Sequence, residues 1–136
     1  MKRRGDWREA LDRYVTDAHK LKFEFGKFDC TQFAINCEKR LLGITYFIEF
    51  DQTYKTSAEG HKILTDLGYA SMFDFISTRK PEITERQARR GDWVGHITQA
   101  GESLGVYAGK HGYWAADIKH GLQLCPIDDI KKVWRV

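Results

Sequence analysis

Apolar residues recur at helical spacing through the first half of the chain. The pattern predicts a first helix from Asp6 with an apolar stripe running to Ala18, a second from Asp29 to a stop at Gly43, and a third from Thr56 to a stop at Gly68. A left-handed glycine is a common helix end. The first and third helices also begin with capping-box spacing, Asp6 to Glu9 and Thr56 to Glu59. The segment SMFDFI after them is predicted to be a short apolar turn.

From Gly91 onward the hydrophobic period changes from helical to two residues, which is typical of strands. Five short strands are predicted, with the sequences DWVGHIT, SLGVYAG, GYWAAD, LQLCPI and VWRV. The turns QAGE, GKHG and IKHG between them each contain glycine. Sequential hairpins indicate an antiparallel sheet, so we expect an α+β fold with N-terminal helices packed on a C-terminal sheet.

Length and charge limit the classes of protein to which the chain can belong. With 136 residues, it has the size of a single domain, residues 1–136. The net charge of +3, from 22 basic and 19 acidic residues, is too small to indicate nucleic acid. Residues 1–22 hold seven Lys or Arg and four Asp or Glu, an excess that equals the whole net charge. We interpret it as a solvated helix face, with a patch for an acidic partner as the alternative.

Targeting and cofactor signals are missing from the sequence. No apolar run approaches the ~20 residues of a membrane span, and no apolar stretch follows the charged start MKRRGDWREA. We therefore expect no membrane span and no signal peptide. The spacings of the three cysteines and five histidines match no zinc or redox motif, so we expect neither a metal nor another cofactor.

Cys30 is the most informative single residue. It directly follows Asp29, the expected N-cap, and so occupies the first turn of a helix. The helix dipole and free amide groups there favour a thiolate, and the same amides can stabilise an oxyanion. Asp29 opposes this effect as an anion beside the thiol. The alternative is a small apolar residue in the buried stripe that also contains Cys37.

Three segments, FEFGKFDCTQF, RRGDWV and SLGVYAGKHGYWAAD, together resemble the NlpC-type branch of papain-like cell-wall cysteine peptidases. That family has a glycine-bearing loop leading into a DCSGF-like helix start, then a GDLV-like strand and an HVGIY-like strand. The order and spacing fit from about residue 7 to the C-terminus. The resemblance is greatest to a short, divergent branch encoded in tailed-phage genomes near tail-tip genes, and it implies helices packed on an antiparallel sheet.

The resemblance also implies a set of catalytic positions, most of which this chain has lost. Cys30 matches the nucleophile. The base, normally His, falls on Ser103, and the third polar group falls on or near Ala115. The family tyrosine appears as Phe23, which lacks the hydroxyl. A lost general base typically removes about 10²–10⁴-fold of rate, so the fold can outlast the activity.

His96 is a candidate for a base that has moved to the neighbouring strand. If Ala100-Gly101 forms a two-residue turn, Thr98 faces Ser103, and His96 lies diagonal to Ser103 on the same side of the sheet. The alternative is a histidine on a sheet face without a catalytic task.

Two functions follow from these expectations. The first is a phage tail-tip protein with a degenerate peptidase fold and weak or absent activity. Its partners would be tail hub or other tail-tip proteins, and it would be made in the bacterial cytoplasm and carried in the virion tail. The second is an active hydrolase of peptidoglycan stem peptides that uses Cys30 and His96. An amidase or acyl-transfer enzyme on another substrate is a third interpretation.

Overall fold

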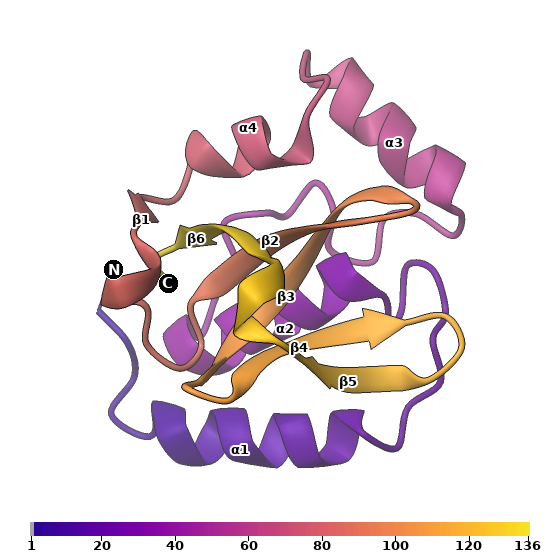
Figure 1. The fold of residues 1–136 in the computed structure, drawn as a ribbon. Coiled ribbons are helices and arrows are strands. Elements are labelled where there is room, and N and C mark those ends of the chain that lie inside the picture. Colours follow the sequence, from indigo (N-terminus) through magenta and orange to yellow (C-terminus); the bar gives the residue numbers. More distant parts are fainter. Residues whose placement is uncertain (1) are drawn as a thin grey trace.

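The computed structural model describes residues 2–136 and has an α+β fold with the helices in the N-terminal part (Figure 1). The helices are α1 (Trp7–Ala18), α2 (Cys30–Leu42), α3 (Ser57–Asp66) and α4 (Met72–Ser77). The strands are β1 (Glu82–Ile83), β2 (Trp93–Thr98), β3 (Gly101–Gly109), β4 (Gly112–Asp117), β5 (Gly121–Cys125) and β6 (Ile130–Trp134). Two short 3-10 turns, η1 (Glu85–Gln87) and η2 (Ile127–Asp129), precede β2 and β6.

The six strands form one antiparallel sheet in the order β1-β6-β2-β3-β4-β5. The five predicted strands correspond to β2 through β6, which confirms the predicted α+β class and the antiparallel sheet. The sequence pattern missed β1 because two residues are too few to show alternation. The last strand, β6, pairs with β2 and lies between β1 and β2 in the sheet, so the C-terminal strand lies beside the first strands in the sequence.

Helix α2 begins and ends where the sequence predicted. The Asp29 side chain accepts a hydrogen bond from the Gln32 amide, 2.7 Å away, and so caps the first turn. Gly43 ends the helix with a left-handed backbone, at φ 84°. Both features follow from local chemistry, which is why short sequence signals were enough to place them.

The other helix ends match the prediction less closely. Thr56 caps α3 as expected, but Asp6 makes no side-chain cap on α1 and pairs with Arg4 instead. The predicted turn SMFDFI is helix α4, capped by the Ser71 hydroxyl. Glu102 on β3 accepts hydrogen bonds from Ser71 and from the first amides of α4, so a distant carboxylate helps to hold this short helix.

The sheet separates two apolar clusters. The larger lies on the side of α2, which runs behind β3 and β4 in Figure 1, and includes Phe33, Trp93 and Trp134. The smaller lies on the other face and consists of Val94, Tyr113, Ala115 and Val133. Neighbouring strand residues such as Trp93 and Val94 point to opposite faces, so each strand contributes to both clusters.

Candidate functional site

The candidate site lies where β3 and β4 separate. Residues 101–106 of β3 pair with β2, but pairing with β4 begins only at Val106. In β4, residues 115–117 pair with β5 and not with β3. Figure 1 shows the β2–β3 and β4–β5 hairpins pointing apart at this end of the sheet. We call residues 101–105 and 115–117 the split.

Cys30 is the first residue of α2 and reaches the split from behind the sheet. Its thiol contacts the Thr31 hydroxyl at 4.0 Å and lies beside the Leu104 backbone. The side chain is partly accessible to solvent. Burial around the sulfur nevertheless raises the pKa of the Cys30 thiol; the Leu104 backbone partly offsets this, and the charge of Asp29 adds to the rise. The sequence suggested that the helix dipole would favour a thiolate, but burial and the Asp29 charge raise the pKa and favour the thiol.

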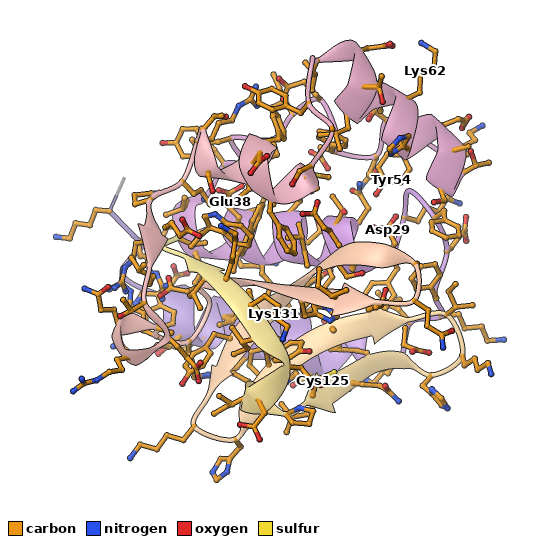
Figure 2. All side chains as sticks on the ribbon, turned by 45° about the horizontal axis from the view of Figure 1, so that its top comes forward. Asp29, Glu38, Tyr54, Lys62, Cys125 and Lys131 are labelled. Carbon is orange, nitrogen blue, oxygen red and sulfur yellow. The ribbon has the colours of Figure 1, made fainter. Side chains whose placement is uncertain are left out.

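Asp29 anchors the start of α2. Its buried carboxylate accepts hydrogen bonds from the amides of Gly26 and Gln32 and from the Tyr54 hydroxyl, with Oδ2 and the phenolic oxygen 2.7 Å apart. Figure 2 labels Asp29 and Tyr54 at the same end of the molecule. All three donors are neutral, so none of them offsets the charge of this carboxylate beside Cys30.

The sequence reasoning did not identify Tyr54. It lies in the loop before α3, where no local motif links it to a helix start 25 residues earlier. Burial and the nearby Asp29 charge raise the pKa of its phenol, so Tyr54 stays protonated as a donor. Its hydroxyl reaches Asp29, whereas the resemblance expected the tyrosine at the position of Phe23.

Gln32, in the first turn of α2, holds the loop that carries Tyr54. Its side-chain amide donates to the Phe50 carbonyl at 2.5 Å and accepts from the Gln52 amide at 3.1 Å. Gln52 has a left-handed backbone, at φ 58°. A buried glutamine that satisfies both ends of its amide explains a polar residue on the inner side of α2.

The structure places His96 directly opposite Ser103, which corrects the predicted register. The β2–β3 turn consists of Gln99 and Ala100, and Thr98 pairs with Gly101. The predicted turn at Ala100-Gly101 is therefore wrong by one position. This moves the partner of His96 from Gly105 to Ser103, a shift of two residues, and side chains two residues apart point to the same face. The expectation that His96 and Ser103 share one side of the sheet is therefore confirmed.

His96 is buried, and it faces the smaller cluster. Its ring centroid lies 5.0 Å from that of Tyr113, and its Nε2 has no hydrogen-bond partner among the described residues. Burial lowers the pKa of the imidazole, and the Leu104 backbone partly offsets this. Cys30 and His96 thus both contact the backbone of the same residue, Leu104. The pKa of Cys30 is raised and that of His96 is lowered, so both residues favour their neutral forms.

The three positions at which the resemblance expects other catalytic groups hold no replacement base. The Ser103 hydroxyl lies 3.4 Å from the Thr98 hydroxyl, Ala115 is buried in the smaller cluster, and the Phe23 ring packs edge-on against Phe25. Cys37 is fully buried in the core, while Cys125 lies partly exposed on β5. His96 is thus the one imidazole that this arrangement connects, through Leu104, to the Cys30 thiol.

Within residues 2–136, no group of three or more His, Cys, Asp or Glu side chains is arranged to hold a metal ion. No helix in the described part of the chain has the length and apolar character needed to cross a membrane.

Comparison with protein families adds one result. Residues 2–136 match the family model described as Domain of unknown function (DUF6950). The chain belongs to this family. The match spans both α2 and the sheet, so Cys30, His96 and Leu104 all lie within the DUF6950 domain. No curated protein matches the sequence.

Proposed function

We propose that this chain is a phage tail-tip protein with an NlpC-like fold and weak or absent cysteine hydrolase activity. The fold and tail assignments are supported by the sequence resemblance, together with an α+β architecture that has a cysteine-headed helix behind an antiparallel sheet. The weak activity is supported by the state of Cys30. A cysteine hydrolase needs a thiolate, and here burial and Asp29 both raise the pKa of the thiol.

The loss of the family base is the single observation that carries this proposal. Ser103 occupies the position at which the resemblance expects histidine, and a serine hydroxyl cannot accept the thiol proton at neutral pH. Ala115 likewise offers no group to orient a base. The binding role would then belong to the protein's surface, with tail hub or other tail-tip proteins as partners.

An active peptidoglycan hydrolase is the second candidate. One observation favours it: Cys30 and His96, which belong to two different elements, both lie beside the Leu104 backbone. In this mechanism His96 takes the Cys30 proton, the sulfur attacks the stem-peptide carbonyl, and the proton passes to the leaving amine as the C–N bond breaks. Water then hydrolyses the thioester and restores the thiol. The lowered pKa of His96 makes it a weak base in the resting protein.

Digestion of purified peptidoglycan separates the two candidates. We expect the wild-type protein to release no more soluble stem peptide than Cys30→Ser or His96→Ala. Cys125→Ser serves as the matched control, because it removes the other partly exposed thiol. Robust digestion that is lost in Cys30→Ser and His96→Ala, and kept in Cys125→Ser, would overturn the proposal in favour of the hydrolase.

The structural role in a tail is tested in the phage that encodes the chain. Cys30→Ser should still enter particles and leave infectivity unchanged, because the thiol has no chemical task in this account. Normal particles that fail to infect would contradict it, and so would purified particles that lack the protein altogether.

A further inference from the structure

A basic hollow lies at the end of β3 that is far from the split. It has a volume of about 630 Å³, and its lining includes Arg86, Arg89, Arg90 and Lys110, together with Glu85 and Tyr107. The hollow spans from η1 to the turn between β3 and β4. Cys30 contacts Leu104, near the start of β3, so the hollow does not belong to the candidate site.

Most of the positive charge in the hollow has no side-chain counter-ion among residues 2–136. Arg90 pairs with Asp12 of α1, and the Arg89 guanidinium lies 3.5 Å from the main-chain oxygen of Val136, but no side-chain carboxylate of residues 2–136 lies within ion-pair distance of Arg86, Arg89 or Lys110. Four cations less the carboxylates of Glu85 and Asp12 leave a net charge of +2. A protein with a total charge of +3 therefore concentrates much of its excess here.

The backbone beneath these cations is held rigidly. The Arg89 amide donates to the Asp92 carboxylate at 3.0 Å, and the Arg3 guanidinium donates to the Arg90 carbonyl at 2.7 Å. The Tyr107 amide donates to the Asp92 carbonyl at 2.8 Å, which joins this turn to β3. The Arg90 guanidinium also lies 5.6 Å from the centre of the Trp114 ring. Arginine and tyrosine on a preorganised backbone are typical of the anchoring residues in protein interfaces.

We propose that this hollow binds an acidic peptide segment of a partner protein. The volume suits a few residues of chain. A phosphate polymer gains affinity by summing many contacts along an extended basic track, whereas these cations are confined to one hollow that also contains Glu85. Carboxylate side chains on a short segment match the guanidinium forks of Arg86 and Arg89. The inference does not depend on the Cys30 site or on the phage assignment.

Fluorescence anisotropy with three labelled probes tests this inference on the full chain. The probes are hexaglutamate, hexaglutamine and the oligonucleotide dT12. We expect hexaglutamate to bind, hexaglutamine not to bind, and dT12 to bind more weakly than hexaglutamate. The double variant Arg86→Ala/Lys110→Ala should weaken hexaglutamate binding by roughly tenfold or more.

The control Lys20→Ala/Lys22→Ala removes the same charge from exposed positions just beyond α1. It should weaken binding less than twofold, and circular dichroism should show both double variants folded. Equal losses in the two double variants would overturn the proposal, because they would show a net-charge effect. Failure of hexaglutamate to bind would overturn it too, and tighter binding of dT12 would replace it with a phosphate-binding surface.

Discussion

Two buried aspartates hold this molecule together by different means. Asp29 at the start of α2 accepts hydrogen bonds from two amides and a phenol, all of them neutral. Asp92 at the start of β2 accepts from two amides and from the guanidinium groups of Arg3 and Arg135. Both carboxylates are almost fully buried, so the difference lies in the charge of their partners.

The charge of the hydrogen-bond donors determines whether a buried aspartate affects only stability or also the chemistry of a neighbouring residue. At Asp92 the negative charge is balanced, and it joins Arg3 near the N-terminus to Arg135 and Val136 at the end of the described chain. At Asp29 the charge is solvated by dipoles alone and acts on its neighbour, where it helps to raise the pKa of the Cys30 thiol. The residue that best stabilises the start of α2 therefore opposes a reactive cysteine.

Replacing Asp92 should give the largest effect. In Asp92→Asn the Arg3 guanidinium stays buried without a counter-ion, which costs about 3–5 kcal/mol of unfolding free energy. Urea denaturation measures this loss of unfolding free energy. Asp12→Asn removes a carboxylate from an exposed pair with Arg90 and should cost under about 1 kcal/mol. Similar losses in the two variants would show that the Asp92 network is not a buried ion-pair network in solution.

Asp29→Asn should lower the unfolding free energy by less than Asp92→Asn does, and it should also lower the pKa of the Cys30 thiol. The variant loses charge-assisted hydrogen bonds from neutral donors, for a cost of about 1–3 kcal/mol. Since removal of the anion favours the thiolate, the pKa of Cys30 should fall. Urea denaturation and the pH dependence of Cys30 alkylation measure the two effects. An unchanged or higher thiol pKa in a folded variant would contradict the role given to Asp29.

Tyr54→Phe should lower the unfolding free energy by a smaller amount, because it removes a single hydrogen bond. The variant removes the hydroxyl donor to Asp29 and keeps the packing of the ring, at a cost of about 1–2 kcal/mol. Tyr46→Phe, at an exposed position, is the control and should be nearly neutral. Equal unfolding free energies for the two variants would argue against a Tyr54–Asp29 bond.

The smallest effect concerns pH and His96. Burial lowers the pKa of this imidazole in the folded protein, so the unfolded chain binds the proton more tightly. The stability contributed by neutral His96 is therefore complete above the unfolded pKa of about 6.5 and is lost as pH falls below it. His96→Gln should flatten the loss of unfolding free energy between pH 7.5 and 5, whereas His61→Gln, on the exposed side of α3, should leave it unchanged. A slope that is the same in all three proteins would count against a buried neutral His96.

Local sequence chemistry was enough to predict three of the four helices and five of the six strands described, together with the cap at Asp29. Helical and alternating periods, glycine turns and an Asp at a helix start all act over a few residues. The same signals failed at Asp6, where Arg4 competes for the carboxylate, and at α4, whose start is supported by Glu102 from a distant strand. They also placed the β2–β3 turn one residue too late, because QAGE permits more than one two-residue turn.

The candidate site was only partly predictable. Cys30 and His96 carried recognisable chemistry, and the structure brings both to the Leu104 backbone. Tyr54 and Gln32 could not be assigned, because their roles depend on a loop folding back onto α2. The direction of the Cys30 pKa shift could not be predicted from the sequence either, because desolvation depends on how the folded chain packs around the sulfur.

The pH dependence of Cys30 alkylation tests the central claim most directly. The native protein is pulsed with iodoacetamide from pH 6 to 10, and fragment ions between Cys30 and Cys37 assign the labelled sulfur by mass spectrometry. We predict an apparent pKa above the free-thiol value of ~8.5, and the same value in His96→Ala. A wild-type pKa well below ~8.5 that rises in His96→Ala would reveal a thiolate–imidazolium pair and contradict the account of a hydrolase fold without its activity.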